Sequence, residues 1–196
     1  SFRSEYYFDA LMKDYEVASY PRSYAADSKA PEARRLDIGI ERKAIMDYCH
    51  RLNVTENSFF MAAFGQLMNR LTRQKRILFT SISNGRMTES MQQIFGMFVQ
   101  TLPVIAELSD GTFEEAVRLM HRQYLDTQDH ALFPYTRITE KYGCHAEVMF
   151  AYQGGLDGSA KEAADDEAVR TTLDTVKMPL MVTVYQAEIG RAVQQE

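Results

Sequence analysis

Histidine and cysteine are the residue types of this chain that most readily bind metals or act as nucleophiles, and their spacing does not favour a shared site. The sequence contains four histidines and two cysteines. Cys49 directly precedes His50, and Cys144 directly precedes His145, so neighbouring side chains point apart on a helix or strand. The chain has no CxxC or HxxxH spacing, which would place two ligands on one ion. We therefore expect no metal site and interpret Cys49 as a core thiol.

One acid–base pair has the spacing of a helical turn. His130 follows Asp126 by four residues, so a helix would let the carboxylate orient the imidazole. The sequence has no G-x-S-x-G nucleophile elbow, and the glycines at 154, 155 and 158 fit neither Rossmann nor P-loop spacing. We interpret His130 as a hydrogen-bonded residue at a helix end. The residues alone predict no complete active site.

Composition and charge indicate an ordinary globular protein. The chain has 196 residues, of which 45% are hydrophobic and 25% are charged, with a net charge of −5. This mildly acidic balance argues against nucleic acid or an anionic membrane as the main partner. No apolar run approaches the roughly 20 residues that span a bilayer. Because the two cysteines form no disulfide framework, we expect a cytoplasmic protein.

The first 35 residues differ from the rest in composition and in hydrophobic pattern. Residues 6–15 fit a short amphipathic helix, and the stretch after them, with Pro21 and Pro31, is typical of an extended loop. We expect residues 1–35 to be an extended N-terminal segment that continues from a larger protein. Residues 36–196 are then predicted to form one folded unit.

Hydrophobic periodicity in residues 36–196 predicts an α/β fold, a mixed β-sheet with helices on one face. Thr55 and Thr112 are expected to cap helices, and Pro103 predicts an edge, a bulge or a bend in its strand. The expected strands are 36–40, 76–83, 97–108, 146–153, 169–175 and 178–187. The expected helices are 45–52, one that begins after Thr55, one from 113 to about 129, and one between Pro134 and Gly143.

Five segments carry recognisable motifs. They are Thr55–Gly65 (TENSFFMAAFG), Ile82–Arg86 (ISNGR), Phe95–Pro103 (FGMFVQTLP), His130–Tyr135 (HALFPY) and Val148–Gln153 (VMFAYQ). In this order they resemble the C-terminal half of the condensation domain of non-ribosomal peptide synthetases. The third segment is similar to the G-x-F-V-N-T-L-P strand of that family, with Gln100 in the position of its Asn.

The resemblance implies one of two chloramphenicol-acetyltransferase-like lobes, with a tunnel between them. Carrier proteins would bring donor and acceptor groups on phosphopantetheine arms, and amide bonds of secondary-metabolite peptides would form in the tunnel. No cofactor would bind directly. The family's H-H-x-x-x-D-G motif belongs to the first lobe and is absent from this sequence. We therefore expect no catalytic residue in this chain, no activity of the chain alone, and partnership with the missing N-terminal lobe or self-association.

The resemblance also assigns roles to particular residues. Arg86 would pair with the signature aspartate of the first lobe; its plainer interpretation is a solvated arginine after a turn. Tunnel and acceptor contacts would come from Gly96, Phe98, Gln100 and Thr101, which could otherwise be strand residues with a glycine bulge. The remaining matches are to a structural helix corner, formed by His130, Pro134 and Tyr135.

Two other functions fit the same residues. The chain could be a lobe of a free-standing acyltransferase that acylates an alcohol or amine. It could also be a non-catalytic module that only docks carrier proteins.

Overall fold

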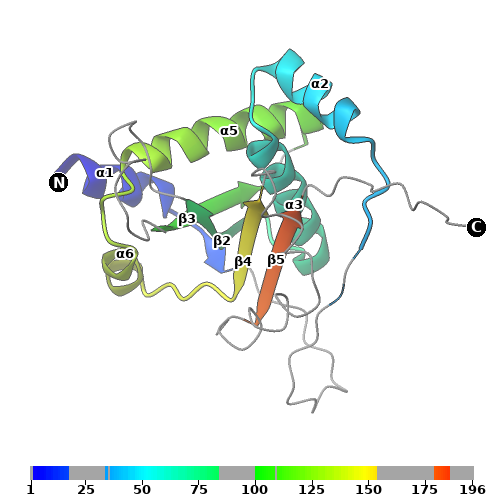
Figure 1. Ribbon diagram of the computed structural model, residues 1–196. Helices are drawn as coiled ribbons and strands as arrows, with labels where there is room; N and C mark the ends of the chain where they lie inside the picture. The colour runs from blue at the N-terminus through cyan, green and yellow to red at the C-terminus, as the bar shows by residue number, and fades with distance from the viewer. Residues whose placement is uncertain are drawn as a thin grey trace, which may run out of the picture.

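The computed structural model describes residues 2–17, 34, 36–83, 100–108, 110–153 and 179–185. Figure 1 shows their helices and strands arranged around one sheet. The helices are α1 (Phe2–Leu11), α2 (Arg42–Leu52), α3 (Glu56–Thr72), α5 (Phe113–Asp129) and α6 (Tyr135–Tyr142). The strands are β1 (Glu16–Val17), β2 (Arg76–Ser83), β3 (Gln100–Glu107), β4 (Val148–Gln153) and β5 (Leu180–Tyr185).

Strand β2 is the centre of a mixed sheet. It pairs antiparallel with β3 along its whole length, from Arg76 opposite Glu107 to Ser83 opposite Gln100. On its other side it runs parallel to β1 near its start and to β4 further along. Strand β4 in turn pairs parallel with β5. The predicted mixed sheet packed by helices is confirmed.

The two faces of the sheet carry different helices. Side chains of one face, among them Ile77, Phe79 and Phe150, pack with α3 and α5 in the larger hydrophobic core. Because side chains alternate along a strand, Leu78 and Ile105 point to the other face, where they pack with α1 and α6. Helices therefore lie on both faces, whereas the sequence pattern predicted them on one.

A side chain from α5 forms hydrogen bonds with the backbone of β3 at the edge that faces away from β2. The Gln123 amide donates through Nε2 to the carbonyl of Ile105, and its Oε1 accepts from the Ile105 N–H, both at 2.8 Å. Backbone groups at Ile105 thus point away from β2, and those of Pro103, two residues earlier, point the same way. Proline is tolerated because no ladder hydrogen bond needs its missing N–H. Within the described sheet, β3 pairs only with β2, so the expected edge position of Pro103 is confirmed.

The predicted strand at 36–40 is wrong. Gly39 adopts a φ of +67°, and its N–H donates to the Asp37 carboxylate at 2.8 Å, which turns the backbone out of an extended path. The three apolar side chains of this stretch are exposed. The N-terminal helix spans Phe2–Leu11 and so begins four residues before its predicted start, and the last strand spans Leu180–Tyr185, within its predicted range. The predicted strand at 169–175 and residues 97–99, 178 and 186–187 lie outside the described residues.

Substitution of Gly65 by alanine should destabilise the fold through one contact. A Cβ at Gly65, inside α3, would lie 2.5 Å from the Cβ of Ala106 in β3. We expect Gly65→Ala to lower the free energy of unfolding by about 1–3 kcal/mol despite the better helix propensity of alanine. Urea denaturation of Gly65→Ala, Ala106→Gly and the double variant measures the coupling. The double variant should lose less free energy of unfolding than the sum of the losses in the two single variants. A loss equal to that sum would contradict the close approach of Gly65 and Ala106.

Candidate functional site

The two described members of the predicted tunnel set, Gln100 and Thr101, lie at one end of the sheet. Parallel strands β2, β4 and β5 finish at this end, and antiparallel β3 begins there, with Gln100 opposite Ser83 and Thr101 opposite Ile82. Of the predicted set, Thr101 is described with its side chain and Gln100 by its backbone. Crevices at the carboxyl ends of parallel strands are common ligand sites. Arg86, Gly96 and Phe98 lie outside the described residues, between β2 and β3 in the sequence.

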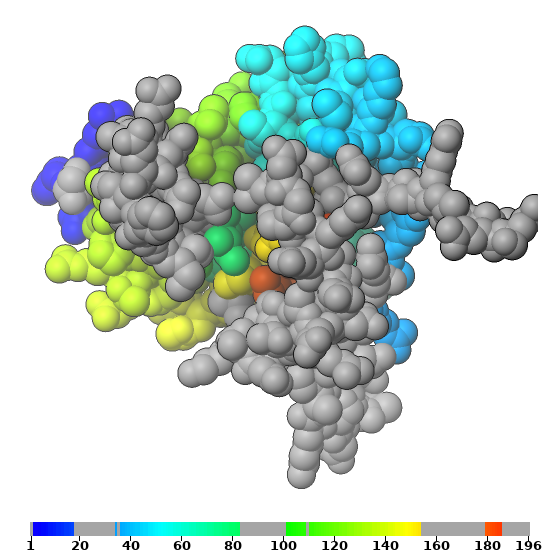
Figure 2. Space-filling view, viewed as in Figure 1, coloured from blue at the N-terminus to red at the C-terminus, as the bar shows by residue number. Residues whose placement is uncertain are grey.

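The sheet face opposite α3 carries a group of uncharged side chains that extends from this end toward the middle of the sheet. We call it the carboxyl-end patch: Ile82, Thr101, Ala151 and Thr183 lie nearer the strand ends, and Met149 and Met181, the second residues of β4 and β5, lie two residues further back, level with Thr80 of β2. Ala151 is buried and the other five are half-buried. In Figure 1 β4 and β5 lie in front of α3, and in Figure 2 their yellow and orange-red atoms reach the surface side by side. No described helix packs on this patch.

The other face has a polar network at the start of α3. The Thr55 hydroxyl accepts from the Ser58 N–H at 3.2 Å and lies 2.9 Å from the Ser58 hydroxyl. Ser58 Oγ also lies 2.9 Å from His121 Nδ1 on α5. A serine beside an imidazole resembles a nucleophile with its base, but Ser58 is completely buried. The network therefore caps α3 and joins it to α5 rather than meeting a substrate.

A second polar contact at this end joins α3 to β4. The Tyr152 hydroxyl donates to Glu56 Oε2 at 2.6 Å, and the Tyr152 ring stacks on Phe60. The predicted core thiol lies nearby: Cys49 is buried, and burial, with a smaller contribution from the Glu56 charge, raises its pKa. A protonated, inaccessible thiol is a weak nucleophile.

The three motif residues of the helix corner lie where α5 meets α6. His130 ends α5, Pro134 is the N-cap of α6, and Tyr135 is the first residue of that helix. His130 Nδ1 lies 3.2 Å from the Ser4 hydroxyl, and its ring stacks on Tyr7. The corner therefore holds α1 against α5. The interpretation of His130 as a hydrogen-bonded residue at a helix end is confirmed, and its described partner is Ser4 rather than Asp126.

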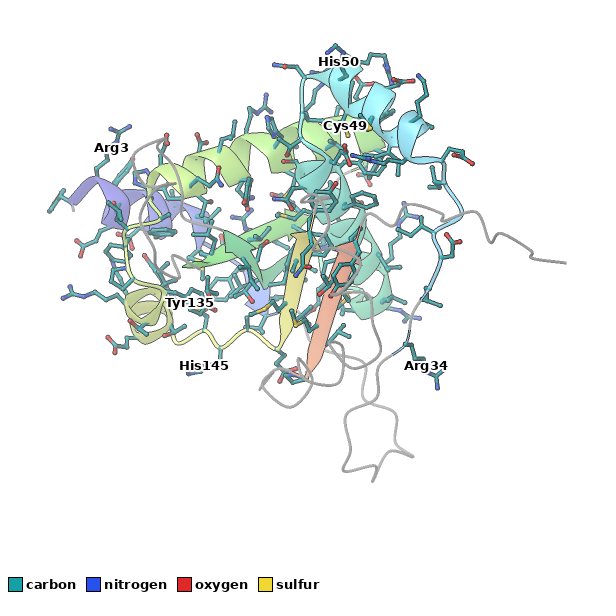
Figure 3. All side chains as sticks on the ribbon, viewed as in Figure 1. Arg3, Arg34, Cys49, His50, Tyr135 and His145 are labelled. Atoms are coloured by element: carbon teal, nitrogen blue, oxygen red, sulfur yellow. The ribbon has the colours of Figure 1, made fainter. Side chains whose placement is uncertain are left out.

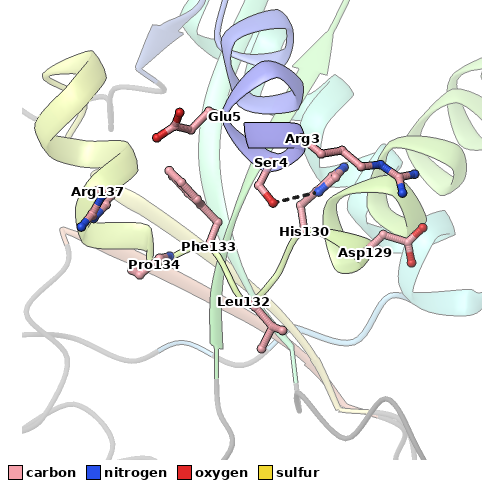
Figure 4. Close-up of a pocket in the computed structure, with 9 residues that line it drawn as sticks. All are labelled: Arg3, Ser4, Glu5, Asp129, His130, Leu132, Phe133, Pro134 and Arg137. Atoms are coloured by element: carbon pink, nitrogen blue, oxygen red, sulfur yellow. Dashed lines mark hydrogen bonds between the residues drawn. The ribbon is translucent and has the colours of Figure 1, made fainter. Parts of the chain in front are cut away.

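This corner borders a cavity of about 720 Å³, shown in Figure 4. Arg3 and Asp129 lie on one side of it, and Glu5 and Arg137 on the other. Each side thus carries both signs of charge, so the cavity has no net charge to favour a cation or an anion. We interpret it as a surface hollow between α1 and the corner.

The remaining histidines and cysteines of the described chain do not gather at one site. In Figure 3 Cys49 and His50 lie on α2, far from Tyr135 and His145. Among the described residues no group of three or more histidine, cysteine or acidic side chains is placed to bind a metal. Burial raises the pKa of Cys144, and it raises the pKa of Tyr135 to about 12, so both stay protonated near neutral pH.

This chain resembles a known protein family and two peptide synthetases in sequence. The family model described as Condensation domain matches residues 7–188. The chain is 26% identical over 147 residues to the nonribosomal peptide synthetase nanA of Aspergillus nanangensis, covering 72% of this chain and 6% of that protein. It is also 24% identical over 140 residues to gramicidin S synthase 2 of Aneurinibacillus migulanus, covering 68% and 3%. The chain therefore spans only a small part of these relatives.

Solved structures show the same fold. The first condensation domain of the CDA synthetase matches with a TM-score of 0.63 and 16% identity, over 80% of this chain and 36% of that one. The condensation domain of the Monacolin K polyketide synthase MokA matches with a TM-score of 0.53 and 21% identity, over 59% and 29%. Within the described ranges, no helix has the length and apolar character needed to cross a membrane.

The burial of His121 predicts that the folded protein loses stability at mildly acidic pH. Burial lowers the pKa of His121 below its ordinary value of 6.5. The unfolded ring then binds a proton at a higher pH than the native ring, so stability falls as the pH drops through the unfolded value. We expect the urea midpoint to fall between about pH 8 and about pH 5.5, and to fall less in His121→Gln. His50→Gln, at an exposed position of α2, should keep the full pH dependence. Equal pH dependence in all three proteins would contradict this role.

Proposed function

The chain belongs to the condensation-domain family, and we propose that it is the C-terminal lobe of a peptide-synthetase condensation domain. In this role it supplies the acceptor side of the tunnel in which an amine on one carrier protein attacks a thioester on another. Residues 36–196 make up the lobe, and residues 1–35, which add α1 and β1 to its core and sheet, connect it to the first lobe. The first lobe supplies the H-H-x-x-x-D-G motif.

The carboxyl-end patch is the observation that carries this proposal. It is an uncharged, largely half-buried sheet face that reaches the strand ends, where it includes Thr101 from the motif FGMFVQTLP. A tunnel wall must hold tethered reactants without reacting with them, and a large part of the rate then comes from proximity and orientation. Thr101 and Gln100 are at the start of β3, so Gly96 and Phe98 precede the patch directly in sequence.

Arg86 has a different role in the proposal. It follows the end of β2 by three residues and would hold the signature aspartate of the first lobe. A planar guanidinium can clamp a carboxylate through two parallel hydrogen bonds, which lysine cannot do. The phosphopantetheine arms of the carrier proteins are the only cofactor that this reaction needs, and they arrive with the partners.

The proposal is tested with the longer protein in which a first lobe precedes this chain. Acyl-loaded and aminoacyl-loaded carrier proteins are mixed with it, and the amide product is followed by mass spectrometry. We expect turnover by the longer protein and none by the chain alone. Turnover by the chain alone would overturn the proposal. Failure of the longer protein would favour a docking module, and transfer to a free alcohol or amine would favour the acyltransferase alternative.

Arg86→Ala in the longer protein should lower kcat/KM about 10- to 150-fold, equivalent to one charged hydrogen-bonded contact of about 1.5–3 kcal/mol. Arg86→Lys should recover little of this loss, because a point charge does not replace the guanidinium fork. The control is Arg122→Ala, an exposed arginine of α5. Wild-type kinetics in Arg86→Ala would show that Arg86 is a solvated surface residue.

A further inference from the structure

The carboxyl-end patch has an order that the sheet register defines. Met149 lies directly opposite Met181, and two residues further along Ala151 lies opposite Thr183. On the far side of β2, Thr101 lies opposite Ile82. Side chains two residues apart share a face, so a pair of long thioethers stands beside a row of smaller groups.

These side chains are available for contact. Both methionines and both threonines of the patch are half-buried, and atoms of β4 and β5 are visible at the surface in Figure 2. Methionine is unbranched and polarizable, so two facing methionines adapt to apolar groups of different shape. Beside them, Ala151 and Thr183 carry shorter side chains, and Ala151 is buried.

The six residues of the patch carry no charge, and one described ion pair of the same face lies away from them. Arg76 and Glu107 point to this face at the opposite end of the β2–β3 pair, where they form an ion pair of 2.9 Å. A charged group placed on the patch would lose hydration without gaining a partner from the described strands. Arg86 does not change this balance, because in the proposed function it is held by the first-lobe aspartate.

From this arrangement we propose that the acceptor amino acid has an uncharged, apolar side chain, and that Met149 and Met181 select it. The inference rests on the proposed function, because it assumes that the acceptor side of the tunnel includes the patch. Thr101 connects the two, since it belongs both to the patch and to the predicted acceptor segment. The methionines act as specificity-determining residues and take no part in proton transfer.

The test uses the longer protein with one fixed donor and a panel of aminoacyl-pantetheine acceptors: leucyl, phenylalanyl, aspartyl and lysyl. We expect leucyl or phenylalanyl acceptors to exceed both charged acceptors at least about tenfold in kcat/KM. Met181→Lys should lower the ratio of leucyl to aspartyl turnover at least about tenfold. Met46→Lys, at an exposed position of α2, is the matched control and should leave the ratio unchanged.

The outcomes separate the two proposals. If the wild-type protein forms no amide with any acceptor, the proposed function fails and the inference falls with it. If amides form but charged acceptors are preferred, or Met181→Lys leaves the ratio unchanged, the inference is overturned and the proposed function stands. If Met181→Lys does not fold, Met149→Gln decides: a loss of leucyl preference of about threefold or more supports the inference, and an unchanged ratio overturns it.

Discussion

The pairing of β2 with its neighbours is the constraint on which the rest of the structure depends. Eight residue pairs join β2 to β3, and shorter parallel ladders join it to β1 and β4. Ile77, Leu78 and Phe79 are fully buried, so the strand has a helix-covered face on both sides. A slip of one residue would turn every side chain to the wrong face. Register at β2 therefore decides which residues enter the core and which form the carboxyl-end patch.

Helix α3 packs on one face of this sheet, so the two faces differ in what they contact. Its glycine at position 65 lets it lie close to β3, and its buried residues fill the larger core with Phe79 and Phe150. Its first turn carries the hydrogen bonds of Thr55 and Ser58, which link it to His121. Polar groups on this face are thus used for stability. No described helix covers the opposite face at the same sheet end, and the proposed function assigns that face to substrate contact.

Local sequence patterns predicted most of the helices and strands, but they could not predict contacts between residues far apart in the sequence. Thr55 and Thr112 were predicted as caps, and both accept hydrogen bonds from the first turn of their helices. The strand prediction at 36–40 failed because one glycine and one aspartate make a turn that apolar alternation conceals. The patch required the strand register, which a single sequence does not contain. Gln123 on Ile105 and His121 on Ser58 join residues 18 and 63 positions apart, so no local pattern could reveal them.

The distribution of charge on the second face is consistent with the proposed role of a lobe that positions substrates and leaves catalysis to the first lobe. Arg76 is held by Glu107 and by two backbone carbonyls at the end of α1 and just after it, at the end of the sheet away from the patch. The patch itself offers hydroxyl, methyl and thioether groups, none of which ionises near neutral pH. In the proposed function, such a surface would restrict the position of the acceptor amine, and the pKa of that amine would be set by the lobe that carries the base. Selectivity and proton transfer would then vary independently, because they would depend on residues of different lobes.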